Sequence, residues 1–232
     1  MASKRRKARE IALKVLYQVD LIGKNPLESF DQVLEEDIVA PGLEALANDF
    51  LGKTTLRGSE DLFASAGDFV EEILSLRKKE NPADLIQDSA LKWLKDEAVA
   101  RELTSRCLSK IASFAAVELF ASELVQKTVQ HLEKIDDILA KFADNWSLDR
   151  MATLDRSILR FAVCELLFFR DIPVNVTINE AVELSKKYST ERSREFVNGI
   201  LDKVQRELKP EKDDPRHKGT AEKHDSDTEE HS

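Results

Sequence analysis

The amino-acid sequence predicts an all-α protein, and three observations support this fold class. Helix-breaking residues are scarce, with seven Gly and six Pro in 232 residues, which favours long helices over many short strands. Apolar residues recur every three or four positions through most of the chain, which is the spacing of a helix that buries one face. Side chains that cap helices precede several of these segments.

The N-terminal part of the chain is expected to contain two helices. Residues 6–22 repeat apolar side chains at helical spacing, and Gly23 suits the position just after a helix. Asn25 is a favourable N-cap for a second helix, because its side chain can accept a backbone N–H and Pro26 fits the first turn.

The middle of the chain, residues 38–112, is harder to assign. Pro41-Gly42, Gly52 and Arg57-Gly58-Ser59 predict loops. Residues 60–79 and 83–112 still show helical apolar stripes. No motif in this stretch carries recognisable chemistry.

The C-terminal half predicts four helical segments. They cover residues 114–142, 154–169, 178–188 and the stretch that follows Ser189-Thr190-Glu191. The segment 154–169 is apolar on most sides, so we expect it at the centre of the fold. Thr177 and Glu180 have the spacing of a capping box.

The last 24 residues differ from the rest of the chain in composition. Residues 209–232 are dense in charged and polar side chains and almost free of apolar ones. Such a segment cannot bury enough surface to offset the entropy lost on folding, so a disordered C-terminal tail is expected.

The composition and motifs exclude several classes of protein. The sequence has no apolar run near the ~18 residues that cross a membrane, so we expect a cytoplasmic protein without a membrane partner. Cys107 and Cys164 lie within helical patterns and are interpreted as reduced core residues. No Cys/His spacing resembles a metal site, and no Gly-rich phosphate loop or catalytic motif is present. We therefore expect no enzyme activity, no metal and no cofactor.

The charge is unevenly distributed. The net charge is −9, which by itself disfavours nucleic-acid binding. Residues 4–14 nevertheless carry six cations and one Glu. A local basic site on an acidic protein is therefore possible.

Three segments, taken in order, resemble the NusB family. They are Arg5-Arg6-Lys7-Ala8-Arg9-Glu10-Ile11-Ala12-Leu13 followed by Val15-Leu16-Tyr17-Gln18; Asn145-Trp146-Ser147-Leu148-Asp149-Arg150 with Leu154-Asp155-Arg156-Ser157-Ile158-Leu159-Arg160-Phe161-Ala162 and Cys164-Glu165-Leu166; and Ile172-Pro173-Val174 with Ile178-Asn179-Glu180-Ala181-Val182-Glu183-Leu184-Ser185-Lys186 and Phe196-Val197-Asn198-Gly199-Ile200-Leu201-Asp202-Lys203. The resemblance covers about residues 4–37 and 114–208.

The resemblance implies both a fold and a function. The fold is a compact helical bundle of two subdomains over residues 1–208, with a helical insertion at about 38–112. The function is transcription antitermination. Members of the family bind single-stranded boxA-type RNA of ribosomal RNA transcripts together with NusE, a small-subunit ribosomal protein, in the RNA polymerase antitermination complex.

The resemblance and the residue chemistry together suggest two groups of site residues. RNA contacts are expected from basic residues at the N-terminus, whose Lys and Arg side chains suit phosphates and bases, and from the last helix. These RNA-binding residues are Lys4, Arg5, Arg6, Lys7, Arg9, Phe196, Asn198 and Lys203. The expected partner-binding residues are Tyr17, Asp155 and Glu180.

Simpler roles remain open for several of these residues. Phe196 suits the core, Glu180 suits a helix cap, and Asp155 suits the first turn of a helix. Gly199, in the middle of a helical segment, is expected to allow close backbone packing or, alternatively, the approach of a ligand.

Two other functions remain as alternatives. One is a helical adaptor or scaffold protein without an RNA function, which the acidic net charge allows. The other is a stand-alone relative of the RNA-binding domain of ribosomal RNA cytosine methyltransferases. The second is disfavoured because no βαβ nucleotide-binding unit follows the domain, and neither cysteine lies in a Pro-Cys loop.

Overall fold

The computed structural model describes residues 2–53, 66–142 and 147–208, and the regular elements in these ranges are all helices. The helices are α1 (Ala2–Ile22), α2 (Pro26–Leu34), the π-helical turn η1 (Glu35–Val39), α3 (Ala40–Lys53), α5 (Ala66–Leu76), α6 (Pro82–Leu94), α7 (Glu97–Gln130), α8 (Leu132–Phe142), the 3₁₀ turn η2 (Leu148–Arg150), α9 (Thr153–Phe168), α10 (Val174–Tyr188) and α11 (Glu191–Leu208). The all-α prediction is confirmed.

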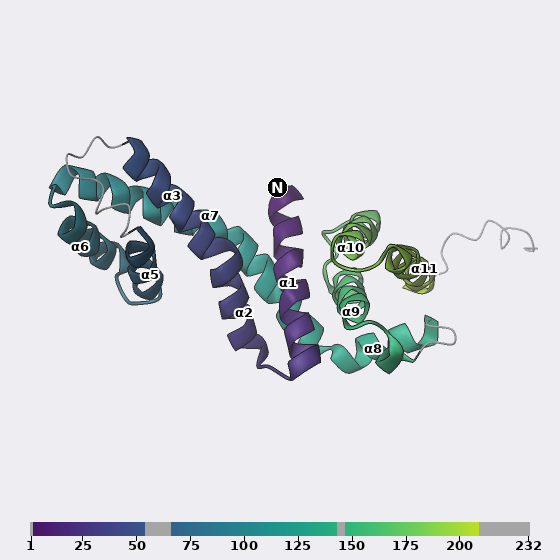
Figure 1. Ribbon diagram of the computed structural model, residues 1–232. Coiled ribbons are helices and arrows are strands. Elements are labelled where there is room, and N and C mark those ends of the chain that lie inside the picture. The colour runs from purple at the N-terminus through teal and green to yellow at the C-terminus, as the bar shows by residue number, and fades with distance from the viewer. Residues whose placement is uncertain (1, 54–65, 143–146, 209–232) are drawn as a thin grey trace, which may run out of the picture.

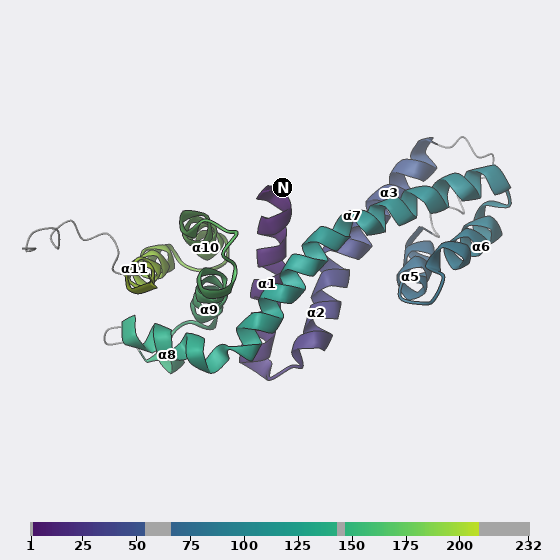
Figure 2. The same ribbon diagram turned by 180° about the vertical axis from the view of Figure 1, so that it is seen from behind.

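The helices form an elongated molecule with two lobes joined by α7 (Figure 1). We call the group α1, α2, α8–α11 and the C-terminal half of α7 the proximal lobe. The distal lobe comprises α3, α5, α6 and the N-terminal half of α7. Seen from behind, α7 runs diagonally from the distal lobe to the base of α1 (Figure 2).

Helix α9 is the centre of the proximal lobe, as its apolar sequence predicted. It packs against α1, α7, α8, α10 and α11. Ile158, Leu159 and Phe161 are completely buried, and so is the Cys164 thiol. Burial raises the pKa of Cys164 to about 11, so this side chain acts as a small apolar core residue.

The turn between α1 and α2 follows the predicted local chemistry. Gly23 has a φ of +64°, a backbone conformation that glycine adopts without a steric penalty. The Asn25 Oδ1 atom accepts hydrogen bonds from the backbone N–H groups of Leu27 and Glu28, at 2.9 and 3.4 Å. The predicted C-terminal glycine and N-cap are both confirmed.

The loop predicted at Pro41-Gly42 is wrong, because these residues lie in the first turn of α3. Proline lacks the N–H that would bond to the preceding turn, and the π-helical turn η1 directly before it, in which the Ala40 N–H bonds to the Glu35 carbonyl, accommodates this break. The turn η1 carries the chain from α2 directly into α3. Gly52, also predicted to lie in a loop, is within α3, whereas residues 57–59 lie outside the described ranges.

The predicted boundary between helices near residue 113 is also wrong. Helix α7 runs through this position without a break for 34 residues. The break lies earlier, where Lys95 adopts a left-handed conformation with a φ of 54° and the Asp96 side chain accepts the Val99 N–H at 3.0 Å. Asp96 is thus the N-cap that begins α7. The sequence contains this capping residue, but the apolar pattern continues across it and predicts one helical stretch over residues 83–112.

Each lobe has its own buried apolar residues. In the distal lobe, Phe50, Ile73, Ile86 and Leu103 come from four different helices and are nearly or fully buried. No helix in the described part of the chain is both long and apolar enough to cross a membrane. The expected tail, residues 209–232, lies outside the described residues.

Candidate nucleic-acid interface

The first turns of α1 carry a cluster of cations, which we call the basic end of α1: Lys4, Arg5, Arg6 and Lys7. Because consecutive helical residues point in different directions, about 100° apart, the four side chains meet different parts of the proximal lobe. Lys4 donates to the backbone carbonyl of Ser113 on α7 at 3.3 Å. The cluster thus spreads from α7 around to α10.

Arg6 makes a paired hydrogen bond to Glu180 on α10. Its Nε and Nη2 atoms lie 2.8 and 2.6 Å from the two carboxylate oxygens. The hydrogen bonds from Arg6 hold the pKa of Glu180 below its usual value. The Arg6 side chain remains 53% exposed, so its charge still faces solvent.

This pairing replaces the predicted capping box at Thr177 and Glu180. Helix α10 begins at Val174, four residues earlier than a capping box with Thr177 as N-cap requires, so Thr177 lies within the helix. The Thr177 hydroxyl donates to the Glu165 carboxylate on α9. Glu180 is therefore held by α1 and does not cap α10.

Arg5 lies against the corner between α9 and α10. Its Nη2 atom is 2.8 Å from the Asp171 carboxylate, and this contact lowers the pKa of Asp171. Its guanidinium also lies 5.3 Å from the centre of the Phe120 ring on α7. A guanidinium over an aromatic face is held by a cation–π attraction that leaves its edge available.

Arg9 occupies a different environment from the four cations that precede it. Its side chain is 2% exposed and makes a paired hydrogen bond to Glu165, with Nε and Nη2 at 2.8 and 2.6 Å from the carboxylate oxygens. Its Nη1 atom lies 3.9 Å from Glu180. Arg9 therefore joins α1 to α9 from inside the protein and faces no solvent.

A pocket of about 390 Å³ lies beside the basic end of α1, between α1 and α10. Arg6, Glu10, Lys186 and Lys187 are among the residues that line it. The Lys187 ammonium is 2.7 Å from the Glu10 carboxylate, which raises the pKa of Lys187. Lys7 lies 3.6 Å from the same carboxylate. Lys186 and Lys187 thus extend the basic surface onto the last turn of α10.

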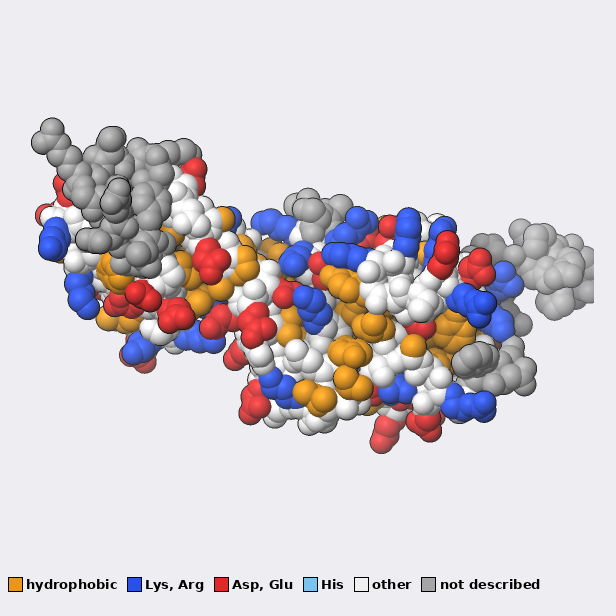
Figure 3. Space-filling model, in the orientation of Figure 1, with side chains coloured by type: hydrophobic (Ala, Val, Ile, Leu, Met, Phe, Trp, Pro, Cys, Tyr) orange, Lys and Arg blue, Asp and Glu red, His pale blue; other side chains and the backbone are white. Residues whose placement is uncertain are grey.

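The space-filling view shows the resulting surface. Lys and Arg side chains gather along the upper edge of the proximal lobe, over the N-terminal end of α1 and over α10 (Figure 3). A net charge of −9 therefore coexists with a local concentration of positive charge, as the uneven distribution along the sequence predicted.

The three expected RNA contacts on α11 lie apart from this cluster. Helix α11 packs on α8, α9 and α10, on the side of these helices that faces away from α1 (Figure 1). Phe196 is half-buried against the core, and Asn198 donates to Asp202 at 3.1 Å. Lys203 lies 3.5 Å from the Phe142 carbonyl at the end of α8. The structure thus separates the expected RNA residues into two groups.

The expectation that Gly199 permits close packing is wrong. A Cβ atom at this position would meet no atom within 4 Å outside the helix itself. Gly199 is exposed on α11, so the packing of α11 does not require a glycine there.

The three expected partner residues do not form one cluster of contacts. Tyr17 is half-buried on α1. Asp155 is buried on α9 and accepts a hydrogen bond from the Ser193 hydroxyl at 2.8 Å, next to the cap of α11. Glu180 lies on α10 beside the basic end of α1, where it pairs with Arg6.

Several residues that shape the basic end of α1 are not among the site residues expected from the sequence. They are Glu165, Phe120, Asp171 and Lys187. A Glu inside the most apolar helix was the available signal for Glu165, because a buried carboxylate requires a partner. The dipeptide Lys186-Lys187 at the end of a helical segment was the signal for the basic turn of α10.

Two related proteins match part of the chain. A NusB protein from Thermodesulfovibrio yellowstonii is 50% identical over 91 residues, which cover 39% of this chain and 60% of that protein. One from Desulfitobacterium hafniense is 55% identical over 85 residues, or 37% of this chain and 57% of that protein. Both are named transcription antitermination proteins. The chain therefore matches about 60% of the length of these relatives.

Solved structures agree on the fold. A crystal structure of the antitermination factors NusB and NusE in complex with double-stranded RNA superposes with a TM-score of 0.51 at 24% identity. The superposition covers 89% of this chain and 99% of that one. At this level of identity the likeness concerns the fold alone.

A sequence model of the NusB family matches residues 82–206, which is more than half of the 232 residues. The match includes residues 82–112, which fall within the expected insertion, and it begins well after α1. The chain belongs to the NusB family.

Proposed function

We propose that this protein is a transcription antitermination factor that binds single-stranded boxA-type RNA at the basic end of α1. It acts by assembly and not by catalysis, with NusE as its protein partner in the antitermination complex. The observation that carries the proposal is the set of half-exposed cations at the start of α1, fixed in place by the side chains and backbone of α7 and α10.

The carboxylates that pair with these cations orient them and do not neutralise the site. Arg6 uses two of the five N–H groups of its guanidinium on Glu180, which leaves three available. Solvent-exposed ion pairs contribute only about 0–1 kcal/mol, so a phosphate can exchange with Asp171 at Arg5 at little cost. Arg9 serves as a positioning residue because its buried pairing with Glu165 fixes the helix that presents the four cations.

Membership of the NusB family supports the partner part of the proposal. A related crystal structure holds NusB, NusE and RNA together. RNA and NusE each increase the apparent affinity for the other if both bind the same conformation of α1 and α10. Tyr17, one of the expected partner residues, is partly exposed on α1 and does not belong to the basic end.

The alternative, an adaptor without RNA function, predicts no RNA binding. RNA affinity should therefore be measured at several salt concentrations. If the four cations of the basic end of α1 neutralise phosphates of a single strand, log K against log salt should have a slope of about −2.8. The variant Arg5→Ala/Arg6→Ala/Lys7→Ala should flatten this slope by about 2, because each lost contact removes ~0.7.

A matched control uses three exposed cations of the distal lobe, in the variant Lys79→Ala/Lys92→Ala/Arg101→Ala. This variant removes the same charge and should keep the slope of the unmodified protein. Equal slopes for all three proteins would contradict the assigned site. Absence of measurable RNA binding in the presence and absence of NusE would favour the adaptor.

A further inference from the structure

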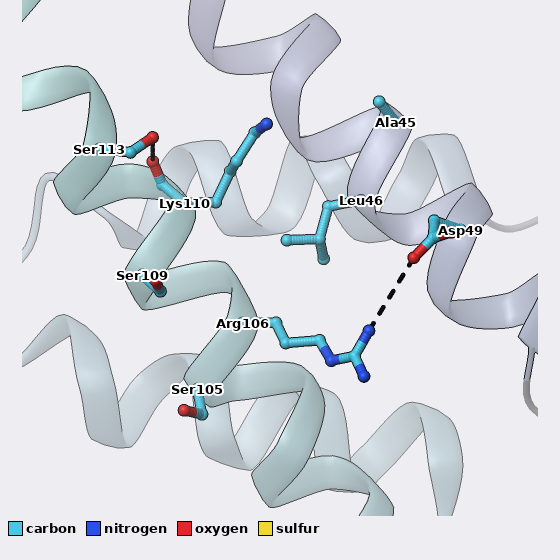
Figure 4. A pocket seen from close by; sticks show the side chains of 8 residues that line it. All are labelled: Ala45, Leu46, Asp49, Ser105, Arg106, Ser109, Lys110 and Ser113. Atoms are coloured by element: carbon cyan, nitrogen blue, oxygen red, sulfur yellow. Dashed lines mark hydrogen bonds and ion pairs between the residues drawn. The ribbon is translucent and has the colours of Figure 1, made fainter.

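A groove that carries two cations lies in the distal lobe, between α3 and α7. The groove has a volume of about 590 Å³. Helix α7 lines it with Ser105, Arg106, Ser109 and Lys110, and α3 contributes Asp49 from the opposite side (Figure 4). Two cations and several hydroxyl groups are donors that suit phosphate and ribose oxygens.

The geometry of the groove depends on Gly42 of α3. A Cβ atom at this position would lie 2.4 Å from Cζ of Phe114 and 3.2 Å from Cε of Lys110. The absence of a side chain therefore lets the Phe114 ring and the Lys110 stem lie directly against α3. The Lys110 ammonium lies 5.7 Å from the centre of that ring, so the charge is held at the groove by a cation–π contact.

The two cations differ in how they are paired. Within the described part of the chain, Lys110 forms no ion pair with a carboxylate. Arg106 pairs with Glu102 at 2.5 Å, one turn earlier on α7, and lies 3.9 Å from Asp49. Its side chain is 43% exposed. Such exposed pairs are weak, so a phosphate can compete for Arg106.

The groove adjoins the basic end of α1. Ser113 lines the groove, and its backbone carbonyl is the group to which Lys4 donates. Along α7, Arg106 and Lys110 are one turn apart, about 6 Å along the helix axis. The cations of α7 and those of α1 therefore follow each other along one side of α7.

We propose that this groove binds the sugar–phosphate backbone of RNA that extends beyond the segment held at the basic end of α1. Arg106 and Lys110 contact phosphates, and the hydroxyls of Ser105 and Ser109 contact phosphate or 2′-hydroxyl oxygens without reading bases. The groove thus lengthens the bound RNA and adds affinity that does not depend on sequence. This inference rests on the proposed function.

The test compares a short boxA-type RNA with the same RNA extended by about ten unstructured nucleotides, the scale of a single-strand site, at either end. We expect one of the two extensions to bind the unmodified protein about five-fold tighter or more. The variant Arg106→Gln/Lys110→Gln should lose this gain, and its salt slope on the extended RNA should flatten by about 1.4. Its affinity for the short RNA should not change.

The control variant Lys92→Gln/Arg101→Gln removes two cations from the same lobe outside the groove, and it should keep the gain. If the unmodified protein binds the short RNA and neither extension adds affinity, the groove inference is overturned while the proposed function stands. The inference is also overturned if the groove variant keeps the full gain. If the unmodified protein binds neither RNA, the proposed function itself fails.

Discussion

Arg9 and Glu165 form a buried ion pair that joins α1 to the central helix α9. The guanidinium and the carboxylate share two hydrogen bonds, at 2.8 and 2.6 Å, and both side chains are at most 2% exposed. The Thr177 hydroxyl gives the same carboxylate a third hydrogen bond. A cation in the middle of the basic sequence at the N-terminus thus fixes the fold, while its four neighbours face solvent.

Removal of one member of this pair should destabilise the protein strongly. We expect Glu165→Ala to lower the free energy of unfolding by about 3–5 kcal/mol, because it leaves a buried guanidinium without its partner. Arg101→Ala, which breaks an exposed pair with Glu97, should cost at most about 1 kcal/mol. Urea denaturation of the two variants measures the difference.

Replacement of both members supplies the complementary test. Arg9→Met/Glu165→Leu removes the charges together and should recover much of the stability lost in Glu165→Ala. Equal losses in the single and double variants would show that the hydrogen bonds, and not an uncompensated charge, determine the effect.

The pair between Arg6 and Glu180 should make stability depend on pH. Because the folded-state pKa of Glu180 is lowered, the pair stabilises the protein above the unfolded-state pKa of about 4.3 and loses this effect on further acidification. The difference in unfolding free energy between the unmodified protein and Glu180→Gln should stay constant above about pH 5 and shrink below it. A difference that is independent of pH down to about pH 3 would contradict the pairing.

Gly199→Ala should stabilise the protein. Gly199 lies inside α11 with open space at its Cβ position, and Ala is favoured over Gly in a helix interior by about 0.5–1 kcal/mol. Thermal unfolding should show a higher Tm. A lower Tm would mean that the backbone at Gly199 meets something in the protein that the described residues do not include.

Ile73→Ala should destabilise the distal lobe and leave the proximal lobe stable. Ile73 is fully buried in the distal lobe, and truncation of such a side chain costs about 2–5 kcal/mol. Amide hydrogen exchange should accelerate in α3, α5, α6 and the start of α7, with α9 and α10 still protected. Uniform acceleration in both lobes would show that they unfold as one unit.

Much of the fold was predictable because the relevant signals are local. The apolar repeat of α9, the N-cap Asn25 and the terminal Gly23 each specify structure over a few residues, and all three were confirmed. The errors arose where one local signal outweighed another. The loop predicted at Pro41 is wrong because proline is also compatible with the start of a helical segment, here α3.

The site was predictable only in part, because pairings between distant residues leave no local pattern. The basic sequence at the N-terminus was evident, but nothing local distinguishes the buried Arg9 from the exposed Arg6. Their environments depend on Glu165 and Glu180, which are more than 150 residues away along the chain. Likewise, Thr177 and Glu180 have the spacing of a capping box, but Thr177 bonds to Glu165 of α9 and Glu180 bonds to Arg6 of α1.

Two helical connections join the lobes: α7, and the continuous run of α2, η1 and α3. Each residue of a helix advances the chain by about 1.5 Å and turns it by about 100°. One residue added to α7 near Ser113 would therefore turn the part of α7 that lines the groove by about 100° relative to the part that packs on α1, while the other connection kept its length. Helix α3 could then no longer keep its packing against α7. The double connection thus fixes the orientation of the groove relative to the basic end of α1.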